Sequence, residues 1–259
     1  MSETRIIAVL NQKGGVGKTT IATNLAHGLA RKGKKVLAID LDPQGHMTAS
    51  LGMAQRKLPG VDDCLLKDKS LLEVSYDVRE NLKLVPAGPG LSEFEKLSEG
   101  GAARGMLLKN KLATEIDDYD FVIMDCPPSS NLLVSNAIFA SNEVMIPMTG
   151  DYLGLQGLAF LMRTLKKFEQ AMGHSLIQWI VLSRYHARRR ISQEVKISLM
   201  TRFTGRVLQT EISESVHLAE CPGFGKTIFE YKPNSKSALE YDALVDELLT
   251  GRNFDGNHT

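Results

Sequence analysis

The sequence predicts an α/β fold in which one mostly parallel, doubly wound sheet carries helices on both faces. Short apolar runs alternate with longer amphipathic stretches along nearly the whole chain, which is typical of strand–helix repeats. Within each run the residues are apolar at successive positions, as in strands covered on both faces. With 259 residues, 43% of them hydrophobic, the chain is long enough for a single domain with a full core.

These patterns predict the following elements in chain order. The strands are Arg5–Leu10, Lys35–Asp40, Leu82–Pro86, Phe121–Asp125, Glu143–Met148, Trp179–Ser183 and Val207–Ile212. The helices cover residues 18–32, 104–117, 131–141, 154–172, 191–204 and 236–250. Glycine and proline punctuate residues 52–104, so loops and short helices are predicted there. We expect one domain over residues 1–250 and a polar tail over 251–259.

The composition is typical of a globular protein of the cytoplasm. The net charge of +1 indicates no particular partner, so any basic surface must be local. Cys64, Cys126 and Cys221 lie far apart and form no C-x-x-C pair, which suits a reducing compartment. No apolar run reaches the roughly 18 residues that a membrane span needs. The first strand begins almost at once, so neither a signal peptide nor an extra N-terminal DNA-binding domain is expected.

A glycine-rich turn between the first strand and the first helix predicts a phosphate-binding P-loop. Its backbone N–H groups would point inward at a helix N-terminus, and Lys18 can reach the β- and γ-phosphates. The Thr19 hydroxyl can ligate Mg²⁺. The residues expected to bind the nucleotide here are Lys13, Gly14, Gly15, Val16, Gly17, Lys18, Thr19 and Thr20. The competing interpretation is a strand–helix turn without a ligand.

This loop departs from the common spelling G-x-x-x-x-G-K-[ST] at two places. Gln12 stands where a glycine is usual, and Lys13 adds a second lysine. If Lys13 faces the phosphates, it adds charge that Lys18 already supplies. If it points away, it could reach phosphates held by another subunit.

Acidic residues follow two of the predicted strands, where a nucleotide hydrolase needs them. Asp125 ends the strand Phe121–Asp125 and has the context of a Walker-B aspartate that holds Mg²⁺. Asp42 is placed to orient or activate the attacking water, and to contribute to the metal site. Asp40 is expected to contact the nucleotide or to organise the same loop. The plainer interpretation is that these aspartates are turn and cap residues.

Three segments together resemble the ParA/Soj branch of the ParA–MinD ATPases, whose Walker A motif is deviant. They are the P-loop, Ile39–Gly45 and Met124–Pro128. Cys221–Ile228 and Tyr231–Lys236 resemble that branch as well, so the similarity covers nearly the whole chain.

The resemblance implies a Mg²⁺-dependent ATPase with catalytic Lys13, Lys18 and Asp42. It also implies an ATP-dependent homodimer, in which Lys13 reaches the partner's nucleotide. The dimer would bind double-stranded DNA nonspecifically on the nucleoid. A ParB-like protein or cargo adaptor would stimulate hydrolysis and release it, and such cycles position plasmids, chromosome origins or large protein cargos.

A basic segment over residues 184–206 is the candidate DNA-binding surface. It carries seven Lys or Arg residues and one acid, Glu194, which gives a local charge of +6. A solvated basic face is the plainer interpretation. The expected contacts are Arg188, Arg189, Arg190, Lys196 and Arg202. Arg188 matches an arginine that similar proteins use for DNA binding, whereas His217 stands where they usually have arginine.

The base-binding loop also departs from the family pattern. Similar proteins usually read Ile-Pro-Arg-Asn where this chain reads Ile212-Ser213-Glu214-Ser215. Ser213 and Ser215 are therefore candidate nucleotide contacts. Arg184 is another, although it could be a plain surface arginine.

Other activities remain open at this stage. A MinD-like membrane ATPase would typically end in a basic amphipathic helix, whereas residues 251–259 are short and polar. A redox ATPase like the nitrogenase iron protein would need cysteines that bridge a cluster. A nucleotide-gated scaffold would bind ATP and barely hydrolyse it.

Overall fold

The sheet of the computed structural model confirms the predicted fold class. The structure describes residues 3–54, 58–97, 101–128 and 132–251. Within these ranges eight strands form one sheet in the order β3-β4-β2-β5-β1-β6-β7-β8. Neighbouring strands are parallel except for the β3–β4 pair at one edge. The strands are β1 Arg5–Val9, β2 Val36–Asp40, β3 Tyr76–Arg79, β4 Leu82–Val85, β5 Phe121–Asp125, β6 Glu143–Met148, β7 Ile177–Tyr185 and β8 Val207–Ser213.

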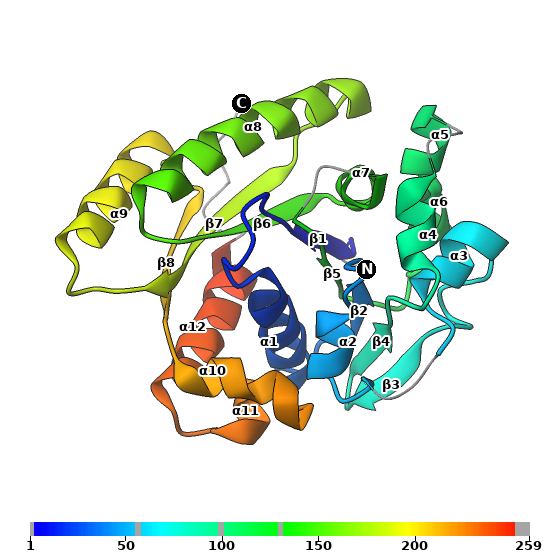
Figure 1. Ribbon diagram of the computed structural model, residues 1–259, viewed down its shortest axis with the longest axis horizontal. Helices are drawn as coiled ribbons and strands as arrows, with labels where there is room; N and C mark the ends of the chain where they lie inside the picture. The colour runs from blue at the N-terminus through cyan, green and yellow to red at the C-terminus, as the bar shows by residue number, and fades with distance from the viewer. Residues whose placement is uncertain (1–2, 55–57, 98–100, 129–131, 252–259) are drawn as a thin grey trace.

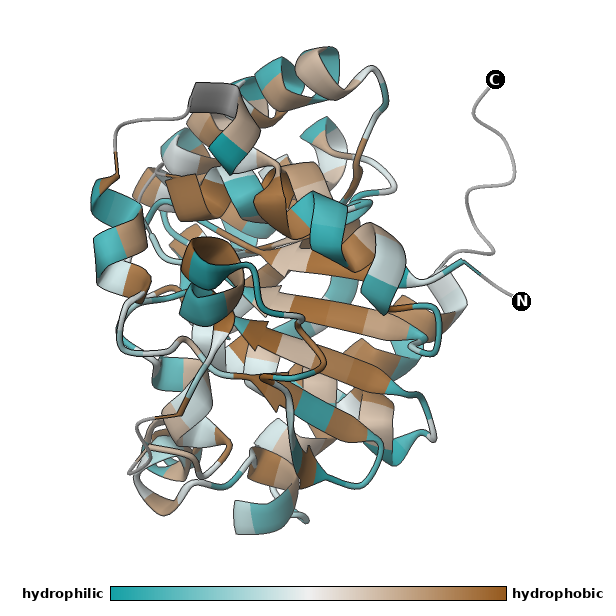
Figure 2. Cartoon of the chain, turned by 90° about the vertical axis from the view of Figure 1, so that its right-hand side faces the viewer, coloured by the Kyte–Doolittle hydropathy of each residue, from teal (hydrophilic) through white to brown (hydrophobic). Residues whose placement is uncertain are grey.

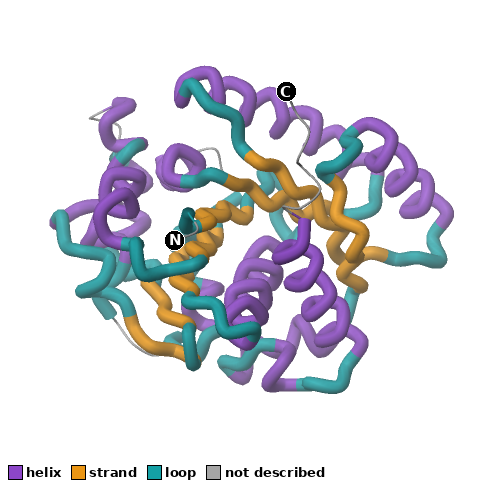
Figure 3. Tube along the Cα trace, turned by 180° about the vertical axis from the view of Figure 1, so that it is seen from behind, coloured by secondary structure: helices purple, strands orange, loops and turns teal. Residues whose placement is uncertain are grey.

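Helices cover both faces of this sheet (Figure 1). On one face lie α1 Lys18–Arg31, α2 His46–Ser50, α10 Val216–Glu220, the 3-10 turn η1 Cys221–Phe224, α11 Ile228–Tyr231 and α12 Lys236–Thr250. On the other lie α3 Val61–Lys67, α4 Leu91–Lys96, α5 Gly101–Gly105, α6 Leu107–Glu115, α7 Leu132–Ala140, α8 Tyr152–Met172 and α9 Arg190–Arg202. The view from behind shows the same two layers around the strands (Figure 3).

The sheet buries both of its faces. In β1, Ala8 belongs to one apolar core, while Ile7 and Val9 belong to the other. Because successive side chains point to opposite faces, a strand between two helical layers must be apolar at every position. The mostly brown strands in Figure 2 show this result. No helix in the described part of the chain is long and apolar enough to cross a membrane.

Several elements differ from their predictions, among them an additional edge strand, a divided helix and a longer strand. The antiparallel strand β3 was not predicted; its residues are only half-buried at the edge, so they lack the apolar run that marks the other strands. The helix predicted over 104–117 is divided between α5 and α6, because Met106 leaves the helical backbone. β7 extends beyond its prediction at both ends. The first residue of the helix predicted over 131–141 and most of the tail, 252–259, lie outside the described residues.

Parallel pairing brings the chemically important segments to one edge of the sheet. In the register of the central strands, Val9 and Asp40 each lie opposite Asp125. The P-loop follows β1, so it emerges beside both aspartates. Ligands of doubly wound sheets bind at this carboxyl edge.

Candidate nucleotide-binding site

A cavity of about 710 Å³ opens at the carboxyl edge of the sheet. This volume lies within the range of pockets that hold small-molecule ligands. The predicted site residues that line it are Gly14, Gly15, Gly17, Lys18, Thr19, Thr20, Asp42, Arg184, Ser213 and Ser215. Four predicted residues are not among its lining: Lys13, Val16, Asp40 and Asp125.

The P-loop has the backbone geometry of an anion site. Gly15 and Gly17 have φ values of 72° and 86°, a region that favours glycine, and Gly17 directly precedes α1. No side chain caps the start of this 14-residue helix. Its first N–H groups and the positive end of its dipole therefore face the cavity. Val16 is buried behind the loop, where its carbonyl accepts a 2.6 Å hydrogen bond from Ser183 Oγ.

Lys18 lines the cavity, and most of its side chain is buried. Its Nζ donates a 3.3 Å hydrogen bond to the carbonyl of Lys13. Burial lowers the pKa of Lys18 from its ordinary value, while the nearby carboxyl of Asp125 acts in the opposite direction. A bound phosphate would give Lys18 a direct ion-pair partner, which none of the described residues provides.

Asp125 fits the role of a metal ligand. Its side chain is fully buried, yet neither carboxylate oxygen has a hydrogen-bond partner in the described structure. Burial, followed by the charge of Asp40, raises the pKa of Asp125 well above its usual range, although Thr19 and Lys18 act against this shift. A divalent cation would coordinate the unpartnered oxygens of Asp125, since Mg²⁺ prefers carboxylate and hydroxyl oxygens. The residues that would hold it are Asp125 and Thr19.

Asp40 and Asp42 lie close together at the end of β2 but differ in their surroundings. Asp40 is fully buried behind the cavity and accepts hydrogen bonds from Thr48 N at 2.8 Å and Thr48 Oγ1 at 2.7 Å. Burial raises the pKa of Asp40 to about 6 despite these bonds. These bonds, together with a 3.2 Å bond that Asp40 accepts from Asp42 N, fit the predicted role of Asp40 in organising this loop. Asp42 itself lines the cavity, where its predicted role would place it.

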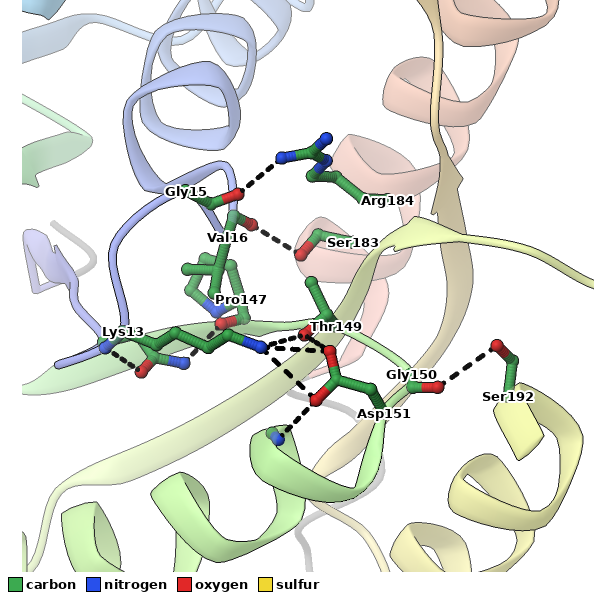
Figure 4. Close-up of polar contacts among 12 residues, drawn as sticks. Lys13, Gly15, Val16, Pro147, Thr149, Gly150, Asp151, Ser183, Arg184 and Ser192 are labelled. Carbon is green, nitrogen blue, oxygen red and sulfur yellow. Dashed lines mark hydrogen bonds and ion pairs between the residues drawn. The ribbon is translucent and has the colours of Figure 1, made fainter.

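The Lys13 side chain is directed toward Thr149 and Asp151 (Figure 4), and Lys13 is not among the residues that line the cavity. Its Nζ lies 3.0 Å from Asp151 Oδ2 and 3.2 Å from Thr149 Oγ1. Asp151 also caps α8, because its Oδ1 accepts a 2.7 Å bond from Gly154 N. Partial burial opposes ionisation of Asp151, but its bonds from Thr149 and Lys13 hold its pKa below the usual value. Sequence reasoning missed Asp151, whose only local signal is a helix-capping aspartate.

Arg184 lies at the rim of the cavity. It has a φ of 49°, which is uncommon for a residue other than glycine and often marks functional sites. Its Nη1 donates a 3.0 Å bond to the carbonyl of Gly15, and its Nε donates a 3.0 Å bond to Glu214 Oε1. Glu214, which also lies 2.8 Å from His186 Nε2, was not predicted as a site residue. Arg184 therefore contacts the P-loop directly.

The two predicted serines differ in what they can offer a ligand. Ser213 lines the cavity, but its N–H donates to Glu240 Oε2 at 3.0 Å and its Oγ to Glu240 Oε1 at 2.6 Å. Its polar groups are therefore already engaged within the protein. Ser215 lines the cavity and is half-buried at the start of α10.

The candidate DNA-binding residues lie at and along α9. Arg188, Arg189, Arg190 and Arg202 are exposed. Lys196 differs from them, because its Nζ lies 2.6 Å from Glu211 of β8 and its side chain is only 31% exposed. Arg190 also pairs with Glu194, at 2.8 Å. The basic cluster therefore lies on the surface, but Arg190 and Lys196 are already paired with carboxylates. Fewer cations are thus unpaired than the sequence count indicates.

Comparisons with known proteins agree with this geometry. The model of the family described as AAA domain matches residues 4–178. The chromosome partitioning protein ParA of Myxococcus xanthus is 37% identical over 248 residues, which cover 95% of this chain and 88% of that protein. The chromosome-partitioning ATPase Soj of Thermus thermophilus is 38% identical over 249 residues, 96% of each chain.

Solved structures extend the similarity to the whole fold. Cobyrinic acid a,c-diamide synthase from Mycobacterium smegmatis, with a bound ATP analog and magnesium, superposes with a TM-score of 0.82 at 32% identity and covers 98% of each chain. A candidate plasmid partition protein from Borrelia burgdorferi bound to AMPPNP gives 0.82 at 25% identity, over 96% of this chain and 99% of that one. The chain therefore belongs to the AAA-domain family, among the ParA/Soj chromosome-partitioning ATPases.

Proposed function

We propose that the protein is a Mg²⁺-dependent ATPase whose ATP-bound form dimerises, binds DNA without sequence preference and positions a cargo. A partner protein would stimulate hydrolysis and so release the dimer from the nucleoid. The observation that carries this proposal is the separation of the two P-loop lysines. Lys18 lines the nucleotide cavity, whereas Lys13 is directed out of it toward Asp151. A second lysine outside its own site would serve the nucleotide of another subunit.

The residues of one subunit supply most of the hydrolytic site. Backbone N–H groups of the P-loop and Lys18 would bind the phosphates. Thr19 and Asp125 would hold Mg²⁺, which neutralises charge on the phosphate oxygens when it is bound. Asp42 lines the cavity and would orient the attacking water. Asp40 keeps the Asp42 loop in place through its bonds to Thr48 and Asp42.

The arginines that precede α9 and end it would supply the DNA contacts. Arg188, Arg189 and Arg202 are exposed, and the structure gives their side chains no ion pair within the described residues. Contacts between such side chains and phosphates carry no base information, so binding would be nonspecific and strongly salt-dependent. Dimerisation would double the number of contacts, which links DNA affinity to bound ATP.

The test compares DNA binding in ADP, in ATP and in a nonhydrolysable ATP analogue. We expect wild-type protein to bind duplex DNA with ATP or the analogue and not with ADP. Lys18→Ala should bind under none of these conditions, while Asp42→Ala should bind persistently with ATP. Equal DNA binding in ADP and ATP would contradict the proposal. Binding without measurable turnover, with and without DNA, would identify a nucleotide-gated scaffold instead.

A further inference from the structure

The end of β7 supports the P-loop through two neighbouring side chains. Ser183 and Arg184 are consecutive residues of this strand, and both line the nucleotide cavity. The Ser183 Oγ donates a 2.6 Å hydrogen bond to the carbonyl of Val16, and the Arg184 Nη1 donates a 3.0 Å hydrogen bond to the carbonyl of Gly15 (Figure 4). Two successive peptide groups of the loop are therefore held from the same strand.

The direction of these carbonyls fixes the direction of the N–H groups that follow them. In a trans peptide group, the C=O and the N–H point to opposite sides. Because the carbonyls of Gly15 and Val16 are turned toward β7, the N–H groups of Val16 and Gly17 are turned the other way. The Gly17 N–H donates to no acceptor among the described residues, so it is available to a phosphate oxygen.

Arg184 is itself held from a second side. Its Nε donates a 3.0 Å hydrogen bond to Glu214 Oε1, and Glu214 Oε2 lies 2.8 Å from His186 Nε2. The hydrogen bonds from Arg184 hold the pKa of Glu214 below its usual value, so this carboxylate remains ionised near neutral pH. The guanidinium thus bridges a fixed carboxylate and the carbonyl of Gly15, which its planar fork of donors permits.

We propose that Ser183 and Arg184 are positioning residues that preorganise the P-loop for phosphate. By holding two carbonyls, they keep the Val16 and Gly17 N–H groups directed at a bound phosphate. Without them the two peptide groups would rotate more freely, and binding would have to order them first. The inference rests on the proposed function, because it requires a nucleotide phosphate in the cavity. Neither side chain has to touch the ligand, which separates their role from that of a phosphate-binding lysine.

The first test compares Ser183→Ala and Arg184→Met with wild type. Calorimetry would measure binding of ATP and of inorganic tripolyphosphate, which carries no base. We expect each variant to bind both ligands about three- to tenfold more weakly, as for the loss of one hydrogen bond. The factor should be the same for the two ligands, because the loss lies at the phosphates. Arg163→Met is the matched control, since Arg163 is an exposed arginine of α8 that does not line the cavity.

A second variant separates positioning from direct contact between Arg184 and the phosphates. Arg184→Lys keeps the positive charge but lacks the fork that bridges Glu214 and Gly15. We expect it to bind tripolyphosphate as weakly as Arg184→Met does. The loss in both variants should be equal at low and high salt, because salt screens a charge–charge attraction far more than it affects the orientation of a peptide group.

Nuclear magnetic resonance of the backbone amides gives a readout in nucleotide-free protein. The amide signals of Val16 and Gly17 should shift or broaden in Ser183→Ala and in Arg184→Met, and should stay in place in Arg163→Met. An arginine that acts only by touching the phosphates would leave these signals unchanged when no phosphate is bound.

Three outcomes would overturn the assignment. One is wild-type affinity for both ligands in Ser183→Ala and Arg184→Met. Another is wild-type binding by Arg184→Lys, which would assign the effect to charge. The third is an unchanged pair of amide signals in the nucleotide-free variants. Failure of wild-type protein to bind ATP would instead refute the proposed function itself.

Discussion

Replacing Asp151 with serine should strengthen ATP-dependent dimerisation. The ion pair between Lys13 and Asp151 holds Lys13 on its own subunit. In the proposed dimer, this pair would have to break before Lys13 could reach the partner's nucleotide. Their Nζ and Oδ2 atoms are 3.0 Å apart, and the two side chains are 38% and 43% exposed. Ion pairs this exposed contribute about 0.2–1 kcal/mol each. Serine removes the charge but can still cap α8, so the helix should be retained.

The expected effect follows from two such pairs per dimer. Releasing both would lower the cost of dimerisation by about 0.4–2 kcal/mol, which is about a 2- to 30-fold tighter dimer. Sedimentation velocity with ATP would measure this in an Asp42→Ala background, where hydrolysis does not interfere. Asp151→Glu is the matched control, since it keeps the charge and should dimerise nearly as the parent does. A weaker dimer in Asp151→Ser would refute the reasoning and would place Asp151 in the interface instead.

Three further predictions concern charge at other positions. His27 is buried with its pKa lowered to about 4 from 6.5, mainly by burial, so stability should be lost as pH falls from 6.5 toward 4. The loss amounts to at most about 3 kcal/mol, and urea unfolding at pH 7 and 4.5 should show a smaller difference for His27→Asn. Glu143→Gln leaves the buried Arg5, 2.6 Å away, without its counter-charge, and should lower the free energy of unfolding by about 3–5 kcal/mol; an unchanged denaturation midpoint would contradict this. Arg188→Glu combined with Arg190→Glu should abolish ATP-dependent DNA binding in a filter assay while ATPase activity persists, and full DNA retention would remove α9 from the interface.

The central part of the fold could be predicted because its signals are local. A buried parallel strand must be apolar throughout, and the glycines of the P-loop are needed at positive φ beside a helix N-terminus. The register of parallel strands then places Asp125 and Asp40 at the same edge as the P-loop. The edge strand β3 could not be predicted, because its half-exposed residues carry no such pattern.

The residues that adjust the site could not be predicted, because their roles depend on contacts between distant parts of the chain. Asp151 meets Lys13 from 138 positions away, and nothing in its own segment indicates that partner. Glu240 engages Ser213 across 27 positions and thereby changes what Ser213 can bind.

The most direct test of the account measures ATP binding and dimerisation separately in the two lysine variants. Isothermal titration at low protein concentration gives the affinity of one subunit for ATP, and sedimentation with ATP at high concentration gives the dimer. The account predicts that Lys13→Ala binds ATP like wild type but remains monomeric, whereas Lys18→Ala loses both properties. Loss of ATP binding by monomeric Lys13→Ala, or normal ATP-dependent dimers of this variant, would contradict the assignment of the two lysines to different subunits' nucleotides.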